Sequence, residues 1–578
     1  MRIRDVELLT GLSRKTIRFY EAKGLLCVDR SDNSYREYDE GDVERLKRIA
    51  VLRQAGVSLA DIQLWQDNVI STSEMLNKRL SELRDEADIA MDQVKLCSRL
   101  LGGELWDLSE ILPGDPAGDA ENDDQTAEPI TPCIGIDIGT TNISAVVLDV
   151  NTGMTAGVYT IANGSDISTE RGWEKLQDAD RIRSRTGRLL DSLLGRYPGV
   201  KAIGITGQMH GILYIDGEGR AVSPLFTWQD QRAGLGAPSP CQRMEELTGY
   251  RISPGYGLAT HYANTLDGTV PENAVMLCTV MDYLVMELTG RKKPLMHSSN
   301  AASLGLYRIC DNTFDRDAVL RCGLDPDFLP DVTEKCEIAG YYRGIAVSAA
   351  IGDNQASFMG AVKEPEHSVL ANFGTGSQIS VMSSSPAPAG DDPSMEIRPY
   401  LENCWLASGS ALCGGRAYAL MERFFRSYVK ACGMPEREQY EVMNRLAEEG
   451  LKKGDFLKVR TSFCGTRGDP GVRGAVDGIS EDNLTPEAMI AGTLWGMADE
   501  LYRMYLQMPH NSADTLIISG NAARKNPALR RMLFHVFGME VYLPAHMEEA
   551  AFGAAMFAAA ASGWGLKELS SCIAYTKA

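Results

Sequence analysis

The chain has 578 residues, 44% of them hydrophobic and 24% charged, so it is long enough for several domains with buried cores. Its formal net charge of -20 excludes a surface that is basic throughout, such as a general nucleic-acid coat. Apolar runs are too short for membrane-spanning helices, and the first residues lack the apolar core of a signal peptide, so we expect a cytoplasmic protein without a membrane partner.

The first 70 residues have the pattern of a small helical domain. Residues 6–13, VELLTGLS, and residues 14–26, RKTIRFYEAKGLL, predict a helix, a turn with glycine, a second helix capped by serine, and a glycine stop. Residues 34–38, SYREY, add an aromatic and basic wing before a third helix over residues 41–55. This order resembles the MerR family of transcriptional regulators, which implies a winged helix-turn-helix that binds double-stranded DNA.

Bulk charge does not decide whether this segment binds DNA, because it carries 12 basic and 12 acidic residues. Placement favours a basic face, since Arg14 and Arg18 lie one turn apart on the predicted recognition helix. We expect Arg14 and Lys15 to contact base edges, and Arg18, Tyr20 and Arg36 to contact the DNA backbone. A small helical domain that binds another protein is the alternative.

An apolar series with alternating spacings of four and three residues follows, which is a heptad seam. It comprises Leu76, Leu80, Leu83, Ala87, Ala90, Val94, Cys97 and Leu101. We expect a coiled-coil helix over residues 71–112, and the MerR resemblance favours a homodimer formed by two antiparallel copies. Such a helix could instead pack on its own domain. Residues 113–132 contain six acids, no base and almost no large apolar side chain, which predicts a linker.

Two glycine-rich turns follow apolar strands at distant points of the remaining chain. Residues 134–142 read IGIDIGTTN, and residues 369–378 read VLANFGTGSQ. Each turn exposes backbone N–H groups and hydroxyls that can hold phosphate, and Asp137 can reach a cation or its waters. One such turn alone is more often an ordinary hairpin, but two of them can grip a phosphate chain between two lobes.

Other motifs accompany these turns in a fixed order. They are GQMHG at 207–211, TWQD at 227–230, IGDNQ at 351–355 and IISGNAARKN at 517–526. The ordered set, from about residue 133 to about residue 563, resembles the FGGY family of carbohydrate kinases in the actin-like ATPase superfamily. The residues within these motifs most resemble those of the sedoheptulokinase-like members of that family.

The resemblance implies an α/β fold with two related lobes, the actin-like or ribonuclease H-like architecture, hinged around an ATP cleft. We expect the first lobe, with the sugar and phosphate sites, at residues 133–366 and the second, with the nucleotide site, at residues 367–578. This kinase would follow the all-α winged helix-turn-helix domain of residues 1–70, the dimerisation helix of residues 71–112 and the linker of residues 113–132.

The resemblance also implies an ATP-dependent phosphotransferase. Asp353 would accept the proton of the attacking hydroxyl, and Asp137 and Asp353 would organise Mg²⁺. A capping role for Asp353 at a helix over residues 354–360 is the plainer alternative. The residues expected at the nucleotide are Gly139, Thr140, Thr141, Asn142, Gly374, Thr375, Gly376, Gly414, Gly415, Gly520, Asn521 and Asn526.

On the sugar side, the GQMHG and TWQD motifs place hydrogen-bonding groups beside a flat indole. The residues expected at the sugar are Gln208, Met209, His210, Trp228, Asp230 and Arg232. A histidine next to a glycine is often only a satisfied structural group, and it is the surrounding motif match that favours a role for His210 in binding.

Three functions fit these patterns. The first is an ATP-dependent ketose kinase, acting on a sugar such as sedoheptulose or xylulose and tethered to a DNA-binding module that regulates transcription. The second is a MerR-type regulator whose kinase-like part only senses a sugar or nucleotide. An actin-like assembly protein ranks last, because it has no use for the sugar-side motifs. The 13 scattered cysteines predict reduced thiols, with neither a disulfide framework nor a zinc site.

Overall fold

The computed structural model describes residues 1–10, 12–26, 29–30, 36–80, 130–386, 394–454, 456–466, 469, 471–508 and 513–578. The chain divides into two compact units. The first comprises residues 1–129 and 184–198, and the second comprises residues 130–183 and 199–578. Within the described ranges, we find no helix with the length and apolar character needed to cross a bilayer.

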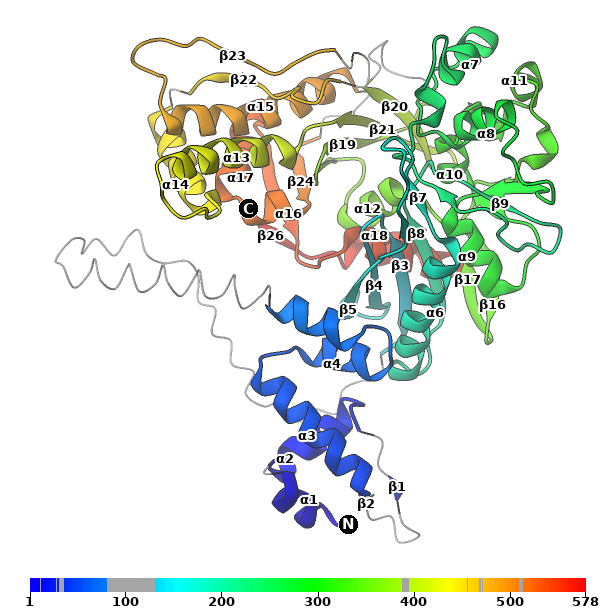
Figure 1. Cartoon of the computed structure of the whole chain (residues 1–578), viewed down its shortest axis with the longest axis vertical. Helices are drawn as coiled ribbons and strands as arrows, with labels where there is room; N and C mark the ends of the chain where they lie inside the picture. Colours follow the sequence, from blue (N-terminus) through cyan, green and yellow to red (C-terminus); the bar gives the residue numbers. More distant parts are fainter. Residues whose placement is uncertain are drawn as a thin grey trace. The chain divides into compact units, whose positions relative to one another are not determined.

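The N-terminal part of the first unit is helical, with one short hairpin (Figure 1). Its elements are α1 (Ile3–Thr10), α2 (Arg14–Ala22), β1 (Asp29–Arg30), β2 (Arg36–Glu37), α3 (Glu40–Gln54) and α4 (Leu59–Gln66). The Ser13 side chain caps α2 by accepting a hydrogen bond from the Thr16 amide, and Gly24 follows the helix with φ of 73°. These are the start and stop signals that the sequence predicts. Strands β1 and β2 pair antiparallel and form the base of the expected wing.

Apolar side chains from all of these helices form the core of the domain. They include Val6, Ile17, Leu46, Ile49, Ile62 and Leu64, each at most 1% exposed. Residues 72–80 continue as a helix. The predicted coiled coil beyond residue 80 and nearly all of the predicted linker lie outside the described residues.

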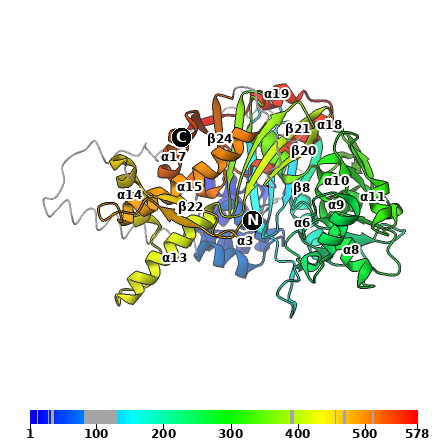
Figure 2. The ribbon, with the colours of Figure 1, turned by 90° about the horizontal axis from the view of Figure 1, so that it is seen from above.

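The second unit contains two lobes, each built on a mixed sheet (Figures 1 and 2). The first sheet has the order β16-β17-β8-β3-β4-β5 and the second the order β20-β21-β19-β18-β24-β25-β26. The first-sheet strands are β3 (Pro132–Ile138), β4 (Asn142–Asp149), β5 (Thr155–Ala162), β8 (Ala202–Gly207), β16 (Ile338–Tyr342) and β17 (Ile345–Ser348). The second-sheet strands are β18 (Ser368–Phe373), β19 (Ser377–Ser383), β20 (Met395–Leu401), β21 (Cys404–Ala411), β24 (Thr515–Ser519), β25 (Glu540–Pro544) and β26 (Tyr575–Lys577).

The two sheets repeat one topology. In the first sheet, β4 pairs antiparallel with β3 and β5, and β8 pairs parallel with β3. In the second sheet, β19 pairs antiparallel with β18 and β21, and β24 pairs parallel with β18. The two glycine-rich turns therefore join equivalent strands, β3–β4 and β18–β19. The turns after β8 and β24, at residues 208–210 and 520–521, are equivalent as well. This duplication confirms the two-lobed actin-like fold.

Smaller elements complete the lobes. In the first half of the unit they are β6 (Asp166–Ile167), β7 (Leu176–Gln177), β9 (Leu213–Ile215), β10 (Leu225–Phe226), η2 (Arg232–Gly234), α7 (Pro240–Thr248), α8 (Gly257–Leu266), β11 (Met276–Cys278), α9 (Val280–Thr289), β12 (Leu295–His297), α10 (Ser298–Ser303), β13 (Tyr307–Arg308), β14 (Thr313–Phe314), α11 (Arg316–Arg321), η3 (Pro326–Phe328), β15 (Asp331–Thr333) and α12 (Asp353–Ala361). Helix α6 (Ala179–Arg196) begins in this unit, and its residues from 184 onward belong to the first unit. In the second half they are α13 (Gly415–Ala431), α14 (Tyr440–Lys453), β22 (Lys458–Arg460), β23 (Ala475–Asp477), α15 (Pro486–Gln507), α16 (Asn521–Lys525), α17 (Pro527–Phe537), α18 (Glu549–Ala561) and α19 (Leu566–Ser571).

Helices α12 and α18 pack on each other between the two sheets (Figure 1). They touch backbone to backbone: a Cβ atom on Gly553 would overlap the carbonyl oxygen of Ala356, and one on Gly360 would overlap that of Glu549. Helix α18 also lies against β3 and β8. The alanines and glycines of α18 therefore allow this close packing.

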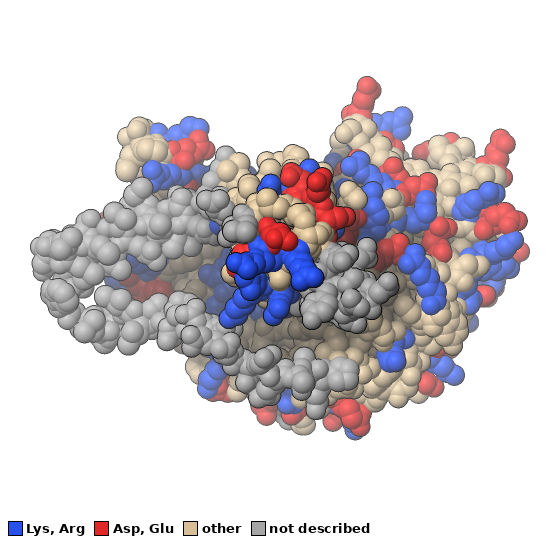
Figure 3. Space-filling model, turned by 90° about the horizontal axis from the view of Figure 1, so that it is seen from below, with Lys and Arg blue, Asp and Glu red and all other residues tan. Residues whose placement is uncertain are grey.

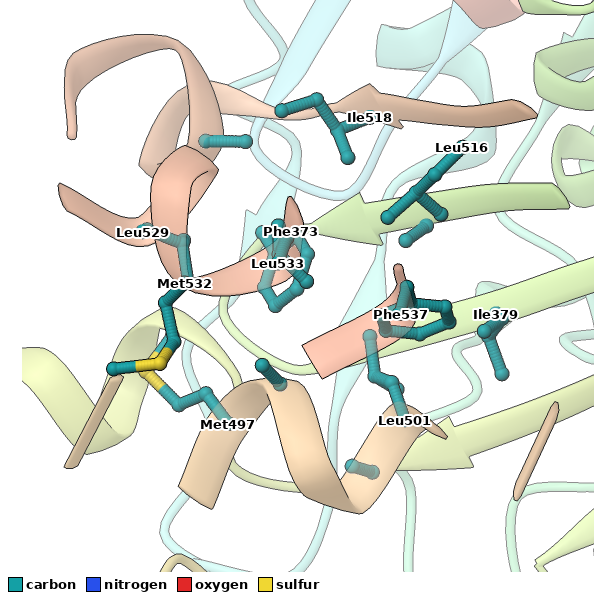
Figure 4. Close-up of a cluster of buried hydrophobic side chains, with 14 of the residues drawn as sticks. Phe373, Ile379, Met497, Leu501, Leu516, Ile518, Leu529, Met532, Leu533 and Phe537 are labelled. Carbon is teal, nitrogen blue, oxygen red and sulfur yellow. The ribbon is translucent and has the colours of Figure 1, made fainter. Parts of the chain in front are cut away.

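The core of the second lobe lies between its sheet and helices α15 and α17 (Figure 4). Leu516 and Ile518 of β24 belong to this cluster, whereas Ile517 packs into the other cluster, on the opposite face of the sheet. Alternation along a strand explains this division, because successive side chains point to opposite faces. Phe373 and Phe537 fill the centre of the cluster shown in Figure 4.

Candidate active site

A cavity of about 810 Å³ lies between the two lobes. Both glycine-rich turns contribute to its wall, and so does the start of α12. The predicted site residues in its lining are Asp137, Gly139, Thr140, Gln208, Met209, His210, Trp228, Asp353, Gly374, Thr375 and Gly376. Segments more than 200 residues apart in sequence thus meet at one place, as the two-turn hypothesis requires.

Amide side chains hold the first turn. Asn163 Nδ2 donates to the Gly139 carbonyl at 2.7 Å, and Gln177 Nε2 donates to the Thr140 carbonyl at 2.9 Å. The Trp228 indole N–H donates to Thr140 Oγ1 at 3.2 Å. Asn163 and Gln177 are buried and were not predicted from the sequence.

The expected nucleotide residues Thr141 and Asn142 continue the first turn, and both are exposed. Thr141 accepts a backbone hydrogen bond from Asn163 at 2.7 Å, and Asn142 begins β4. Neither belongs to the described lining of the cavity.

The loop before α13 supports the second turn. The Gly415 amide donates to the Gly374 carbonyl at 2.9 Å, and the Arg416 amide donates to the Thr375 carbonyl at 3.1 Å. A Cβ atom on Gly414 would overlap the backbone of Gly376. Gly414 and Gly415 therefore support the second turn through their backbone. Neither belongs to the described lining of the cavity.

The turn after β24 lies behind the same wall. Gly520 has φ of 88°, and a Cβ atom there would stand 2.5 Å from the Phe373 carbonyl oxygen, so glycine is required on both counts. Asn521 begins α16 and is exposed, and Asn526 caps α17 by accepting from the Leu529 amide at 3.0 Å. None of these three residues belongs to the described lining of the cavity.

Two carboxylates, Asp137 and Asp353, lie in the cavity wall. Burial, together with the negative charges of Asp353 and Glu548, raises the pKa of Asp137 to about 8. Burial also raises the pKa of Asp353, to about 6, while Arg398 and the backbone of Asn354 act in the opposite direction. Each carboxylate is therefore costly to ionise without a cation nearby.

The two carboxylates suit a magnesium ion. Among the described residues, no group of three or more His, Cys, Asp or Glu side chains is arranged to hold a metal by itself. Mg²⁺ commonly takes only one or two protein carboxylates, keeps several waters and binds phosphate oxygens. Asp137 and Asp353 together with a bound triphosphate would supply that set.

Helix α12 begins at Asp353, with Gly352 in the cap position and no side chain acting as the cap. The Asp353 carboxylate therefore does not cap α12. The next side chain, Asn354, donates to Gln378 Oε1 at 3.0 Å and to Ser380 Oγ at 3.2 Å, both on β19 of the second lobe. These bonds fix the start of α12 against the opposite lobe.

Three basic side chains, Lys175, Arg398 and Arg416, also line the cavity. The sequence did not predict these residues. Arg398 is buried, and both its Nε and Nη2 donate to Glu396 Oε2, at 3.0 and 2.7 Å. Its positive charge also favours the ionised form of Asp353.

A second cavity, of about 430 Å³, adjoins the first and shares Met209, His210 and Arg398 with it. His210 has φ of 73°, its Nδ1 lies 2.7 Å from the Ser303 carbonyl oxygen, and its ring stacks on Tyr256 with centroids 5.2 Å apart. Since a carbonyl oxygen can only accept, Nδ1 carries the proton and Nε2 of the neutral ring is an acceptor. The Tyr256 hydroxyl donates to Glu396 Oε1 at 3.0 Å and so links the two lobes across this chamber.

Asp230 and Arg232 are placed differently from the other sugar-side residues. Arg232 Nε donates to Asp230 Oδ1 at 2.8 Å, and Asp230 Oδ2 accepts from the Lys175 amide at 3.0 Å. Arg232 also donates to Asn264 and lies over the Phe226 ring. Both residues are outside the described lining of either cavity, and their contacts order the segments that carry Trp228 and Lys175.

In the N-terminal unit, Arg14, Lys15 and Arg18 are exposed on α2. Arg14 Nε is paired with Glu7 at 2.8 Å. Figure 3 shows Lys and Arg side chains gathered on the face of this unit that it views, with acidic side chains beside them. Tyr20 is only 6% exposed and belongs to the core, so its placement does not suit the expected contact with the DNA backbone. The side chain of Arg36 is outside the described part of the chain.

Comparison with known families gives three matches. Residues 133–362 match the N-terminal domain of the FGGY family of carbohydrate kinases, and residues 369–562 match the C-terminal domain of that family. Residues 1–68 match the MerR HTH family of regulatory proteins.

Several curated relatives are carbohydrate kinases. A sedoheptulokinase of Mus musculus is 27% identical over 478 residues, covering 74% of this chain and 97% of that protein. The sedoheptulokinase of Homo sapiens is 26% identical over 474 residues with the same coverage, and a xylulose kinase of Streptomyces rubiginosus is 24% identical, covering 74% of this chain and 87% of that protein.

Solved structures give the same fold. A xylulose kinase from Rhodospirillum rubrum superposes with a TM-score of 0.66 at 19% identity, covering 77% of this chain and 93% of that one. A ligand-bound xylulose kinase from Lactobacillus acidophilus gives a TM-score of 0.65 at 18% identity, covering 78% and 93%.

Proposed function

The chain belongs to the FGGY family of carbohydrate kinases, and from this premise we propose that it transfers the γ-phosphate of ATP to a hydroxyl of a ketose such as sedoheptulose or xylulose. The observation that carries the proposal is the interlobe cavity, where both glycine-rich turns meet Asp353 and the GQMHG segment. The relatives named sedoheptulokinase and xylulose kinase support the choice of a ketose.

Asp353 is the proposed base. Its pKa of about 6 leaves the carboxylate ionised at neutral pH, ready to accept the proton as the hydroxyl attacks. In a loose phosphoryl-transfer transition state, alignment matters more than basicity, and the Asn354 bonds to β19 provide that alignment.

The two turns are proposed to receive the phosphate chain, with Gly139 and Thr140 on one side and Gly374, Thr375 and Gly376 on the other. Lys175, Arg398 and Arg416 supply positive charge in the same wall. Asp137 and Asp353 would hold Mg²⁺, and the ion would supply charge that neutralises the phosphates. The raised pKa values of both carboxyls are consistent with a site completed by a cation.

The sugar is proposed to lie where the two cavities join. His210 Nε2 can accept from a sugar hydroxyl, Gln208 can exchange hydrogen bonds with another, and Trp228 presents an indole that is 45% exposed. Within this arrangement Asp230 and Arg232 act by holding neighbouring segments.

The decisive experiment compares the wild-type protein with Asp353→Asn. With Mg-ATP, the wild type should phosphorylate at least one ketose from a panel of sedoheptulose, xylulose and ribulose. The variant should lose ~10²- to 10⁴-fold in kcat, the usual effect of removing a general base, while calorimetry shows ATP binding retained. A wild-type protein inactive on every ketose would refute the proposal.

We also propose that residues 1–70 bind double-stranded DNA, supported by the MerR match and the exposed Arg14, Lys15 and Arg18 on α2. The domain boundaries proposed are 1–70, 71–112, 113–132, 133–366 and 367–578, with the 71–112 helix pairing two copies as a homodimer. Arg18→Gln should weaken duplex binding and reduce the salt slope by about one. Arg45→Gln, which removes an exposed charge paired with Asp42 on α3, is the control and should leave both unchanged.

A regulator without catalysis is the competing function. It predicts ketose binding by calorimetry and no sugar phosphate after prolonged incubation with Mg-ATP. The kinase proposal predicts the sugar phosphate and ADP in equal amounts, which mass spectrometry and a coupled ADP assay can measure.

A further inference from the structure

Two cysteines that are 51 residues apart in sequence meet beside the interlobe cavity. Cys464 Sγ lies 3.8 Å from Cys413 Sγ. Cys413 is buried between β21 and α13, whereas Cys464 is exposed in the loop after β22 and contributes to the cavity wall. Neither thiol has a role in the proposed phosphoryl transfer.

The pair is close to the geometry of a disulfide. The sulfur atoms of a disulfide are about 2.05 Å apart, so bonding needs an approach of less than about 2 Å, within reach of loop adjustment. Arg416 Nη1 lies 3.5 Å from Cys464 Sγ and places positive charge against the sulfur that solutes can reach. The thiolate is the form of a cysteine that attacks oxidants, and Cys464 is the sulfur of the pair that lines the cavity.

We propose that Cys464 and Cys413 form a reversible intrachain disulfide, made by peroxide and broken by dithiol reductants, that weakens nucleotide binding. The Cys464 thiolate attacks one peroxide oxygen, the O–O bond breaks, and the released hydroxide takes a proton to become water. The Cys413 sulfur then attacks the sulfenic sulfur, the S–S bond forms, the S–O bond breaks, and the Cys413 proton leaves in a second water. Two thiols lose two electrons, and one peroxide is reduced to two waters.

The order of these steps follows from the surroundings of each sulfur. Burial and the neighbouring Cys464 raise the pKa of Cys413 to about 12, so this thiol stays protonated until its partner is oxidised. Cys464 is open to the cavity and meets the oxidant first.

The bond would reach the nucleotide through the backbone next to Cys413. Gly414 and Gly415 follow directly, and the Gly415 amide holds the Gly374 carbonyl of the second glycine-rich turn at 2.9 Å. Drawing Cys413 toward Cys464 shifts the contact between Gly415 and the second glycine-rich turn. It also takes the Cys464 sulfur away from Arg416. This effect rests on the proposed function, since it assumes that this wall receives the nucleotide. The second cavity, which contains His210 and Tyr256, is lined by other segments, so sugar binding there should be unaffected.

The test uses the full-length protein before and after hydrogen peroxide. Peptide mapping without reductant should find a 413–464 cross-link that has lost two hydrogens and disappears with dithiothreitol. The KM for ATP should rise ~5-fold or more, at the low end of coupling between sites, and return on reduction, while ketose affinity by calorimetry stays constant. Cys464→Ser, at an exposed position, should lose both responses, and Cys413→Ala should do the same.

Cys432→Ser is the matched control, because Cys432 is exposed in the same lobe at the end of α13. It should respond to peroxide like the wild type. Absence of the 413–464 peptide, or a rise in KM that persists in Cys464→Ser, would overturn the disulfide. A cross-link found in a protein that phosphorylates no ketose would leave the modification standing and refute the proposed kinase function instead.

Discussion

Asp353 shows how one residue depends on neighbours that come from elsewhere in the chain. Burial raises its pKa, and Arg398 of β20 opposes that rise from the other lobe. Arg398 in turn is held by Glu396, which Tyr256 contacts from the first lobe. The pKa of Asp353 therefore depends on side chains from both lobes.

Replacing Arg398 should change the pH profile. The acid limb of kcat/KM should fall below about pH 6 in the wild type, because a protonated Asp353 cannot accept the hydroxyl proton. Arg398→Gln removes the charge that favours the carboxylate, so the limb should move to higher pH. Initial rates measured from pH 5 to 8 check this, and an unmoved limb would contradict the role assigned to Arg398.

The matched control for that experiment is Arg416→Gln. Arg416 lines the same cavity but is not among the groups that shift the pKa of Asp353. Its removal should raise the KM for ATP and leave the acid limb where it is. Arg398→Lys keeps the charge and should restore much of the wild-type profile.

Asp137 should affect the stability of the ligand-free protein. Its pKa is about 8 in the folded protein and about 3.9 in an unfolded chain. Between these values the folded state holds a proton that the unfolded state has lost, so this carboxyl makes stability fall as pH rises. Asp137→Asn removes that dependence. The melting temperature of the variant minus that of the wild type should therefore be more positive at pH 8 than at pH 5.

Calorimetric melting at the two pH values measures the difference. Asp482→Asn, at an exposed position of the second lobe, should change the melting temperature by the same small amount at both. An Asp137→Asn difference that is equal at pH 5 and pH 8 would show that this carboxyl ionises normally in the folded protein.

Sequence patterns at this scale succeeded where the chemistry is local. The two glycine-rich turns and Asp353 could be placed because each follows directly from a strand, and the structure brings them into one cavity. Gln177, Lys175 and Arg398 carry no such local signal, since they reach the site only through tertiary packing. The TWQD motif that contains Asp230 is local, but the contacts of its carboxylate with Arg232 and the Lys175 amide are tertiary and carry no signal in the motif.

At the scale of elements, the crossing of α12 and α18 requires glycine at particular positions. Their contact at Gly360 and Gly553 has no room for a Cβ atom, and Gly135 of β3 admits the backbone of α18 in the same way. The small residues of α18 are typical of a closely packed helix. They could not predict that this helix of the second lobe would pack on strands β3 and β8 of the first.

Gly553→Ala should destabilise the kinase by ~1–3 kcal/mol, the usual cost of forcing extra volume into a packed interior. The added methyl would overlap the Ala356 carbonyl, so the two helices have to separate. Urea unfolding of the full-length protein measures the loss.

Gly187→Ala provides the contrast. Gly187 lies inside α6, and a Cβ atom there meets nothing within 4 Å. The same substitution should therefore stabilise the protein by about 0.5–1 kcal/mol, the gain expected for alanine over glycine in a helix. Equal losses for both variants would show that helix propensity, and not the crossing, decides the outcome.

The whole molecule joins both domains of the FGGY carbohydrate kinases to a segment that matches the MerR HTH family of regulatory proteins. If ligands of the kinase control DNA affinity, linkage requires that DNA change ligand affinity by the same factor. We expect a ketose with a non-hydrolysable ATP analogue to change the affinity for the protein's own promoter by ~5-fold or more. Fluorescence anisotropy at fixed salt measures one direction, and calorimetry with and without the duplex measures the other.

Asp353→Asn distinguishes occupancy from turnover in that experiment. The variant should bind both ligands without transferring phosphate, so an undiminished effect on DNA affinity would assign control to binding. Identical promoter affinities with and without ligands would mean that the two activities share a chain without communicating.

The glycine crossing of α12 and α18 sets the way in which the cleft can open. At Gly360 and Gly553 the backbones of the two helices meet with no room for a Cβ atom, so we expect the lobes to turn about this crossing when the cleft opens. Displacement is smallest near the crossing and grows with distance from it. We therefore expect Asp353, the first residue of α12 and the proposed base, to move less than the outer walls of the cleft and to keep its position from one turnover to the next.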